Sequence, residues 1–313
     1  MHIEKRVVRG KTKYYLAHSF RSDSRVRKLR VFLGTDLGNE EVQRRAAAAR
    51  AKLEDRIRSA KEIGDPYRTV LSPDELKEIT VLTTRVEMKL AHLSETDWAR
   101  FTEEFTYDTN AIEGSTVSKK EVRQVLTEGR WPEKSKEEIS ETIGVAEAVR
   151  YVRETRTHLS FALILELHRI VFKNSKQFAG QTRRRSGVEV SVVDGRGRVI
   201  HRGAPASQVD SQLRRLVDWY EDNRRRYPPF VLAAVVHDQF ETIHPFQDGN
   251  GRVGRLLLIN ILLKHGLPPL NIELKNRKEY YDSLREYQTK GNLRPTLDLM
   301  LKEYRRLKTA LKR

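Results

Sequence analysis

The most informative segment of the chain is HPFQDGNGRVGR, residues 244–255. It lies between an apolar pattern that ends near Ile243 and the apolar run LLLINILL at 256–263, so we expect a loop that opens a buried helix. Gly249 and Gly251 allow a ligand to approach the backbone closely, and the amides at a helix N-terminus carry partial positive charge. The segment therefore predicts a binding site for an anion.

Four side chains of this segment suit a ligand that carries several phosphates. Arg252 and Arg255 are three residues apart on one face of the first helical turn, so their guanidinium groups can reach different phosphates. Asp248 offers a hard oxygen ligand for Mg²⁺, and His244 can accept a proton near neutral pH. A lone histidine or a G-N-G sequence is usually structural, but this combination has few structural explanations.

The composition narrows the class of protein. The 313 residues have a mass of 36.5 kDa, enough for one large or two ordinary domains. The chain has no cysteine, which excludes thiol nucleophiles, cysteine-ligated zinc and iron–sulfur clusters. The start MHIEKRVVRG lacks the apolar core of a signal peptide, and the run at 256–263 is too short to span a bilayer. We therefore expect a cytoplasmic protein with no membrane partner.

The formal net charge of +17 is concentrated in three segments. Residues 1–31 hold ten basic and two acidic side chains, residues 176–202 hold seven and two, and residues 302–313 hold six and one. Such patches suit a polyanion, an acidic protein or a nucleotide, and they suit a solvated surface equally well. The charge by itself leaves the partner open.

The N-terminal region reads as a small basic module. Residues 3–33 combine β-branched and aromatic residues in runs separated by a polar break, which indicates a β-hairpin or a three-stranded sheet. From Asn39 onward apolar residues recur at helical spacing, which indicates one long amphipathic helix to about residue 62. We expect residues 1–63 to form this module and residues 64–94 to contain a linker, at 64–70, and a connecting helix capped by Ser72.

The remainder of the chain is predicted to be mainly α-helical. Two S-x-x-E sequences, Ser118 to Glu121 and Ser135 to Glu138, each precede apolar residues at helical spacing and indicate capping boxes. One interruption, residues 188–201, has β-branched runs on both sides of a glycine turn and predicts a β-hairpin. We expect a helical bundle with this hairpin at 95–270 and closing helices at 271–313.

At these residues the sequence resembles a known family. HPFQDGNGRVGR matches, at every defined position, the HPFx[DE]GNGRxxR signature of Fic proteins, which transfer AMP from ATP to a hydroxyl group of a target protein. The resemblance covers roughly residues 95–270 and implies the Fic-type helical bundle. The related Doc kinases have lysine in place of the second loop glycine, whereas this chain has Gly251, which favours transfer of AMP over phosphate.

The resemblance also implies a role for each residue of the segment. His244 would deprotonate the target hydroxyl, which attacks the α-phosphate of ATP, and Asp248 would bind Mg²⁺. The amides of Gly249 and Gly251, with Asn250, would hold the α-phosphate. The two arginines would grip the β- and γ-phosphates of the departing pyrophosphate; these are Arg252 and Arg255. The 188–201 hairpin would bind an extended segment of the target protein by β-addition.

A second motif lies upstream of the first. TNAIEG, from Thr109 to Gly114, fits the inhibitory motif [ST]xxxE[GN] of the same family, at the end of a predicted helix. In the family the glutamate, here Glu113, pairs with the second arginine, here Arg255, and prevents ATP from adopting its productive pose. The motif precedes the active-site segment, so the resemblance implies the class II arrangement, in which inhibition is intramolecular.

Two alternatives to an autoinhibited adenylyltransferase stay open at this point. The same site could remove AMP from a modified target, because the inhibitory glutamate positions a water molecule in some family members. The basic N-terminal module could instead make the chain a nucleic-acid-binding regulator, with the module also open as an accessory targeting device. The resemblance adds homo-oligomerisation as a further expectation, but the sequence contains no motif for it.

Overall fold

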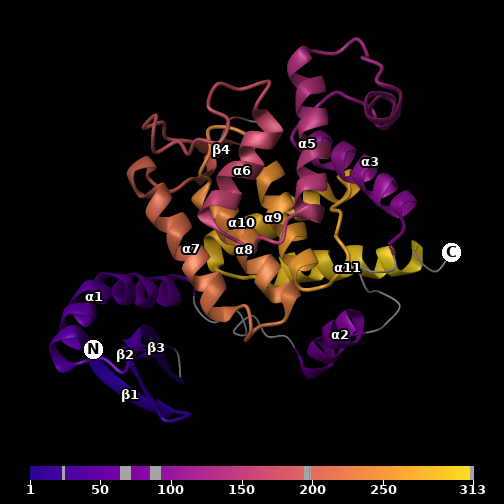
Figure 1. Ribbon diagram of the computed structural model, residues 1–313. Helices are drawn as coiled ribbons and strands as arrows, with labels where there is room; N and C mark the ends of the chain where they lie inside the picture. Colours follow the sequence, from indigo (N-terminus) through magenta and orange to yellow (C-terminus); the bar gives the residue numbers. More distant parts are fainter. Residues whose placement is uncertain (23–24, 64–71, 85–92, 194–196, 198, 311–313) are drawn as a thin grey trace. The chain divides into compact units, whose positions relative to one another are not determined.

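The computed structural model of the chain describes residues 1–22, 25–63, 72–84, 93–193, 197 and 199–310. The chain divides into two compact units, Met1–Pro66 and Tyr67–Arg313, which are described separately (Figure 1). The linker predicted at 64–70 lies outside the described residues.

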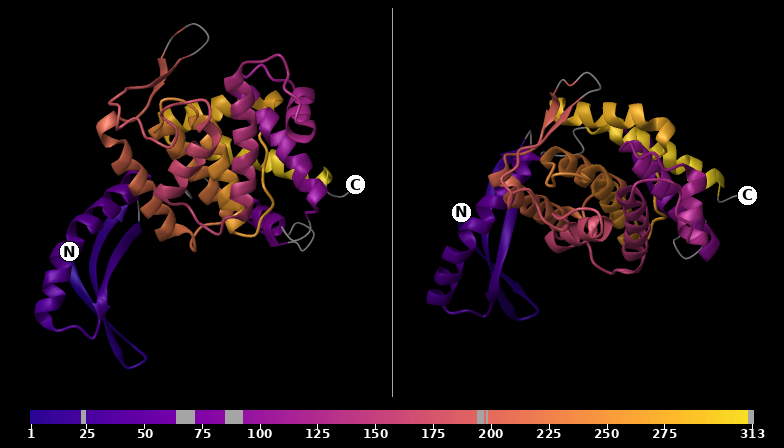
Figure 2. Two further views of the ribbon diagram at one scale, coloured as in Figure 1. Left: turned by 45° about the horizontal axis from the view of Figure 1, so that its top comes forward. Right: turned by 90° about the horizontal axis from the view of Figure 1, so that it is seen from above.

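The N-terminal unit is a three-stranded antiparallel sheet with one helix. The strands are β1 (His2–Val8), β2 (Lys11–Ser22) and β3 (Arg25–Thr35), in the order β1-β2-β3, and the helix is α1 (Asn39–Glu62). The helix covers one face of the sheet, as Figures 1 and 2 show. Tyr14, Leu16 and Phe20 of β2 pack there against Leu53 and Ile57 of α1. The predicted strands and helix are confirmed.

The second unit is mainly α-helical, as predicted. Before the hairpin it contains α2 (Pro73–Thr84), α3 (Glu95–Ile112), α4 (Lys119–Arg123), the π-helical turn η4 (Gln124–Glu128), α5 (Lys136–Glu154) and α6 (Phe161–Phe172). After it come the 3₁₀ turn η5 (Ala206–Gln208), α7 (Val209–Asn223), α8 (Pro229–Ile243), α9 (Asn250–Lys264), the 3₁₀ turn η6 (Leu274–Asn276), α10 (Arg277–Lys290) and α11 (Arg294–Ala310). None of the helices in the described part of the chain is both long and apolar enough to cross a membrane.

The centre of this unit is the antiparallel pair α8 and α9 (Figures 1 and 2). Helix α9 packs against α3, α5 and α6, and α8 packs against α7, α10 and α11. Almost every residue of α9 is buried, so this helix is enclosed on all sides rather than packed along one face. The loop between α8 and α9 is therefore fixed by a helix at each end.

The capping signals act as the sequence predicts, with one exception. Ser72 and Ser118 each exchange hydrogen bonds with the glutamate three residues later, which completes the capping box. Ser135 accepts a hydrogen bond from the Glu138 amide. The Glu138 carboxylate, however, accepts from the Thr116 amide at 2.7 Å instead of from the Ser135 amide, so it anchors the segment after α3 to α5. The complete box predicted at Ser135 is therefore wrong.

The predicted hairpin is present as a two-stranded antiparallel sheet. It consists of β4 (Ser191–Val193) and β5 (Val199–Arg202), paired from Ser191 with Arg202 to Val193 with Val199. The predicted turn at 194–197 lies mostly outside the described residues. The Nε2 atom of His201 lies 2.9 Å from the carbonyl oxygen of Thr242 at the end of α8. This contact places the hairpin beside the α8–α9 loop.

Candidate active site

The candidate active site lies where α8 ends and α9 begins. His244 follows α8 with a left-handed backbone, φ 52°, a conformation that costs a non-glycine residue about 1–3 kcal/mol. Gly249 precedes α9 with φ 80°, and a Cβ atom at this position would lie 2.2 Å from the ring of Phe172. Gly249 offers no side chain to cap α9, so the first amides of this long helix are oriented toward the loop without a side-chain acceptor.

Two residues hold the loop from inside the protein. The side chain of Asn250 accepts from the Phe246 amide and donates to the Phe246 carbonyl, both at 2.9 Å. The ring of His168 stacks on Phe246 with 3.8 Å between ring centroids. Because the Gly180 amide donates to Nδ1 of His168, Nε2 carries the proton and donates to the Asp248 carbonyl at 3.2 Å. The Asn250 side chain is thus used within the loop, and its backbone amide is the part that faces a ligand.

Arg183 satisfies the carbonyl groups at the end of α8. Its side chain is completely buried and donates to the carbonyls of His244 at 2.7 Å and Ile243 at 3.2 Å. It also contacts the carbonyl of Ala204, beyond β5, and its own amide donates to the Pro245 carbonyl at 2.9 Å. A cation at a helix C-terminus with this many carbonyl partners is stabilising. Arg183 therefore fixes the backbone of His244 and the segment that follows the hairpin.

The ring of His244 is mostly buried, with 19% of the side chain exposed, and it is neutral at pH 7. Burial lowers the pKa of His244 to about 4, and the nearby His201 and Arg183 act in the same direction. Nδ1 lies 3.3 Å from the Glu241 carbonyl oxygen, which can only accept, so Nδ1 carries the proton. The other ring nitrogen, Nε2, consequently holds the lone pair that can accept a proton.

The second arginine of the segment is enclosed by three partners. Arg255 is 1% exposed, and its Nε donates to the hydroxyl of Thr109 at 2.7 Å. One terminal nitrogen donates to Glu113 Oε1 at 2.7 Å and to the Thr109 carbonyl at 3.0 Å, and the other donates to the Tyr280 hydroxyl at 3.1 Å. The structure thus brings together the two predicted motifs, which are more than a hundred residues apart in the sequence.

Two glycines allow Glu113 to reach this position. Glu113 ends α3, and Gly114 follows in the left-handed region with φ 96°, as predicted for a residue beyond a helix C-cap. A Cβ atom at Gly251 would lie 2.1 Å from Oε1 of Glu113. The carboxylate therefore lies directly against the backbone of the first turn of α9, on the surface where an anion would otherwise approach.

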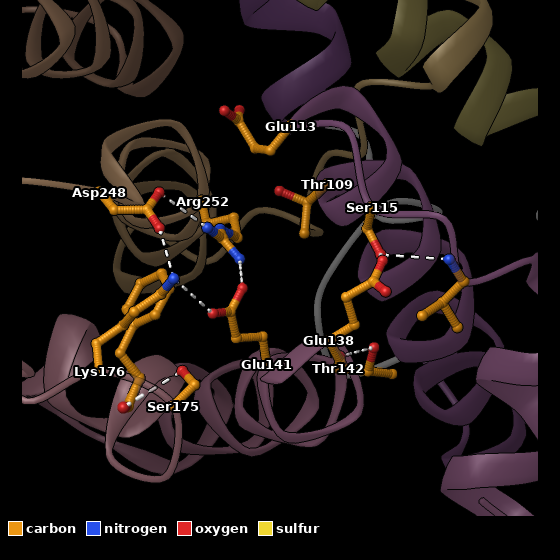
Figure 3. A network of polar contacts seen from close by, with 12 residues as sticks. Thr109, Glu113, Ser115, Glu138, Glu141, Thr142, Ser175, Lys176, Asp248 and Arg252 are labelled. Carbon is orange, nitrogen blue, oxygen red and sulfur yellow. Dashed lines mark hydrogen bonds and ion pairs between the residues drawn. The ribbon is translucent and has the colours of Figure 1, made fainter. Parts of the chain in front are cut away.

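The first arginine belongs to a separate network, which links the start of α9 to α5 (Figure 3). Arg252 contacts Glu141 of α5 and also pairs with Asp248 at 3.2 Å. The ammonium group of Lys176 lies 3.2 Å from Asp248 and 3.6 Å from Glu141, so two cations and two anions alternate. Although burial acts to raise it, Arg252 and Lys176 hold the pKa of the Asp248 carboxyl below its ordinary value. Arg252 also stacks on Phe172, with 4.5 Å between its guanidinium carbon and the ring centroid.

A cavity of about 170 Å³ opens beside His244. Glu113, Glu241, Tyr280 and Tyr281 contribute to its walls, together with residues of β4 and β5. Burial and the neighbouring Glu113 charge, opposed by Arg255, raise the pKa of Glu241 to about 8, so the Glu241 carboxyl is protonated at pH 7. Glu113 is the carboxylate that pairs with Arg255, at 2.7 Å.

The structure gathers the predicted site residues around one loop, and it adds others. His244, Asp248 and the arginines at 252 and 255 surround the start of α9, with Glu113 beside them. Several residues that contact this set have no function predicted from the sequence: Glu141, Lys176, Arg183, Glu241 and Tyr280. Lys176 and Arg183 fall in the basic segment 176–202, which is a sequence signal for them. Glu141 and Tyr280 lie on helices whose sequences look ordinary, so only helix packing reveals them.

The fold and the site together define a class of protein, a helical bundle in which the loop before a buried helix is suited to bind phosphate. Comparison with known proteins shows which family the chain is similar to. Residues 158–262 match the Fic/DOC family. The chain is 36% identical over 200 residues to protein adenylyltransferase fic-1 of Caenorhabditis elegans, which covers 61% of this chain and 37% of the relative. It is 33% identical over 196 residues to protein adenylyltransferase Fic of Nematostella vectensis, covering 60% and 44%.

Solved structures agree with this result. A fragment of Fic-1 from C. elegans matches with a TM-score of 0.59 and 28% identity, covering 88% of this chain and 78% of that one. A Fic family protein from Desulfovibrio desulfuricans G20 has the same fold, with a TM-score of 0.62 over 77% of this chain and 74% of that one. Residues 158–262 therefore match the Fic/DOC family, and the fold is that of solved Fic proteins. The aligned region spans less than half the length of the two curated relatives.

Proposed function

We propose that the chain is an autoinhibited protein adenylyltransferase that transfers AMP from ATP to a hydroxyl group of a target protein. The observation that carries this proposal is the geometry of the α8–α9 loop. A neutral histidine with its lone pair on Nε2, an open helix N-terminus and two arginines surround the place where the triphosphate would lie. Within this proposal residues 95–270 form the catalytic domain, and the helices at 271–313 supply Tyr280 to it.

His244 would act as the general base. Its Nε2 would accept the proton of the target hydroxyl as the oxygen attacks the α-phosphorus of ATP. The bond between the α-phosphorus and the oxygen bridging to the β-phosphate breaks, and pyrophosphate leaves. Because an adjacent negative charge favours the protonated imidazole, a bound triphosphate would raise the pKa of His244 from its low value and make it a better base.

The start of α9 would bind the phosphates. The amides of Gly249, Asn250 and Gly251 precede or open a helix with no side-chain cap, and they would stabilise charge that develops on the α-phosphate. Arg252 and Arg255 lie three residues apart and pair with carboxylates from different elements, and they would contact the β- and γ-phosphates after exchanging these partners.

The residues present fit a magnesium ion that arrives with the nucleotide. The described residues contain no group of three or more histidine, aspartate or glutamate side chains that could bind a metal. Asp248, however, is 43% exposed beside the phosphate-binding turn. Mg²⁺ in nucleotide sites commonly takes one or two carboxylates plus phosphate oxygens, so Asp248 alone suffices. When bound there, the ion would neutralise charge on the phosphates.

Glu113 would act as the brake. Its carboxylate, 28% exposed, occupies a guanidinium nitrogen of Arg255 that a phosphate would need, and it places a negative charge in the cavity. At about 170 Å³ the cavity is smaller than the ~300–1,000 Å³ typical of ligand pockets. Removal of the Glu113 side chain would enlarge the cavity and release Arg255 together.

The β4–β5 hairpin would bind the target protein. It contributes Val192, Ile200 and His201 to the cavity wall, so a segment paired with it would lie beside His244. Val193 and Val199 are half exposed, which is consistent with an apolar partner segment. We propose that an extended stretch of the target adds a strand here and thereby positions its hydroxyl.

The decisive experiment is intact-mass spectrometry of the full chain after incubation with Mg·ATP. We expect a gain of one AMP unit or more in Glu113→Gly, little in the wild type, and none in Glu113→Gly combined with His244→Ala. Glu113→Gln serves as the matched control, because it keeps the size of the side chain and the helix end while removing the charge.

Several outcomes would contradict parts of the proposal. Equal incorporation by wild type and Glu113→Gly would refute the brake. Transfer of phosphate instead of AMP, or an adduct that survives in the His244→Ala variants, would refute the assigned chemistry. Loss of AMP from a pre-modified protein in the wild type, with none gained in Glu113→Gly, would favour removal of AMP at the same site.

A further inference from the structure

The N-terminal unit presents a sheet face that its own helix does not cover. Helix α1 packs on the side of Tyr14, Leu16 and Phe20, so the alternating residues point to the other side. We name this second side the open face. It consists of His2, Glu4, Arg6 and Val8 of β1, Lys11, Lys13, Tyr15, Ala17, Ser19 and Arg21 of β2, and Val26, Lys28, Arg30 and Phe32 of β3.

The charge of the open face is strongly one-sided. It carries six cations and, among its described residues, one acid, Glu4. Glu4 pairs with Arg6 at 2.7 Å, with Lys28 at 2.6 Å and with Arg30 at 3.0 Å, contacts that lower its pKa to about 2. One carboxylate thus arranges three cations from two strands into a fixed array.

Several of these cations have no evident role in the fold. Arg6 lies directly opposite Lys13, and like charges opposite one another destabilise a sheet. Charged residues protect the edge strands of many sheets, but Lys11, Lys13 and Arg21 lie on β2, which is the central strand. An anionic ligand would account for an arrangement that folding alone disfavours.

Aromatic side chains accompany the cations. The rings of Tyr15 and Phe32 lie 5.4 Å apart on neighbouring strands, and Phe32 is 54% exposed. The guanidinium carbon of Arg6 lies 6.0 Å from the ring centroid of Tyr15. An exposed aromatic pair among cations can contact the sugars and base methyl groups of a nucleic acid as well as its phosphates.

From these observations we infer that the open face of the N-terminal sheet binds double-stranded DNA. Strands in a sheet lie about 4.8 Å apart, so three strands span about 10 Å between outer axes, and the major groove of B-DNA is about 12 Å wide. The cations of the face would contact phosphates, with the aromatic pair toward the groove. This binding is independent of the proposed transfer of AMP.

The test uses fluorescence anisotropy of the full chain with a short labelled DNA duplex of mixed sequence, over a series of salt concentrations. We expect the triple variant Lys11→Gln, Lys13→Gln and Arg21→Gln to bind at least about tenfold more weakly. Each phosphate contact contributes about 0.9 to the slope of log affinity against log salt, so the slope should decrease in magnitude by about 2 to 3. Phe32→Ser should weaken binding without changing the slope.

A charge-matched control separates a specific face from general attraction to a basic protein. Arg44, Arg50 and Arg58 are exposed on α1, which lies on the other side of the sheet. Changing all three to glutamine removes the same charge and should leave affinity within about twofold. His244→Ala should bind DNA like the wild type. Circular dichroism establishes that each variant is folded.

Three results would overturn the inference. Equal weakening in the two triple variants would show that net charge alone attracts DNA. Tighter binding to the corresponding single strand or RNA duplex would mean a different nucleic-acid ligand. Absence of duplex binding at about 50 mM salt would remove nucleic acid as the ligand and favour an acidic protein.

Discussion

The two arginines at the start of α9 each pair with a glutamate, but the two glutamates lie in different surroundings. Arg255 pairs with Glu113 at the end of α3, and Arg252 pairs with Glu141 of α5. Glu113 reaches over the backbone at Gly251 and into the cavity, whereas Glu141 belongs to a balanced network with Lys176. Under the proposed function, the Arg255–Glu113 pair would inhibit because its carboxylate lies in the ligand's place, whereas the Arg252–Glu141 pair would position its arginine.

The largest effect should come from removing each glutamate in turn. Glu113→Gly should raise AMP transfer about 10- to 100-fold, because it releases Arg255 and removes a charge from the cavity. Glu141→Gln should not raise transfer and should lower it severalfold, because Arg252 loses the partner that orients it. Initial rates with α-labelled ATP measure both. Comparable activation by the two variants would mean that the two arginine–glutamate pairs have the same effect on transfer.

Alanine substitutions at the two glycines of the loop should differ in their effect on stability. Gly249→Ala places a methyl group against the Phe172 ring at a left-handed position and should lower the free energy of unfolding by about 2–4 kcal/mol. Gly251→Ala meets the movable carboxylate of Glu113 and should cost less than about 1 kcal/mol.

Urea titration of both alanine variants tests this contrast. Gly251→Ala should not itself activate transfer, because its methyl group would lie where the phosphate approaches the backbone, and Glu113→Gly should add little activation in that background. Full activation by Glu113→Gly in that background would show that the methyl group leaves the phosphate site open.

The pH dependence should report the buried state of His244. Burial, together with the nearby His201 and Arg183, lowers its pKa to about 4, although the hydrogen bond to the Glu241 carbonyl and the charge of Glu113 act to raise it. A general base must be unprotonated, so kcat/KM of Glu113→Gly should be level at pH 6.5 and fall only near pH 4 to 5. A fall in kcat/KM that begins at or above pH 6.5 would show that the His244 ring is not buried in the free enzyme.

The smallest effect should come from changing Tyr280, the third partner of Arg255. Tyr280→Phe removes the hydroxyl that accepts from Arg255 at 3.1 Å but leaves Thr109 and Glu113 in place. We expect a loss of about 1 kcal/mol in the free energy of unfolding and less than about a threefold rise in transfer. Activation as strong as that of Glu113→Gly would mean that the position of Arg255, rather than the charge of Glu113, is the brake.

Local sequence signals predicted much of the fold. Helix α1, the N-terminal strands and the β4–β5 hairpin follow from periodicity and turn residues, which act over a few residues. The local prediction was wrong where a side chain could hydrogen-bond with more than one partner. Glu138 satisfies the local requirement of a capping box, yet it contacts Thr116 of a distant segment, because tertiary packing offered a second set of donors.

The sequence by itself determined the chemistry of the loop, because His244, Asp248 and the two arginines lie within twelve consecutive residues whose spacing on a helix start is fixed. Only the tertiary structure decided which side chains pair with these residues and hold them in position. Glu113, Glu141, Lys176 and Tyr280 come from four other segments, and they meet α9 through the packing of apolar helix faces far from the motif. That packing depends on the shapes of whole helices, which no short stretch of sequence encodes.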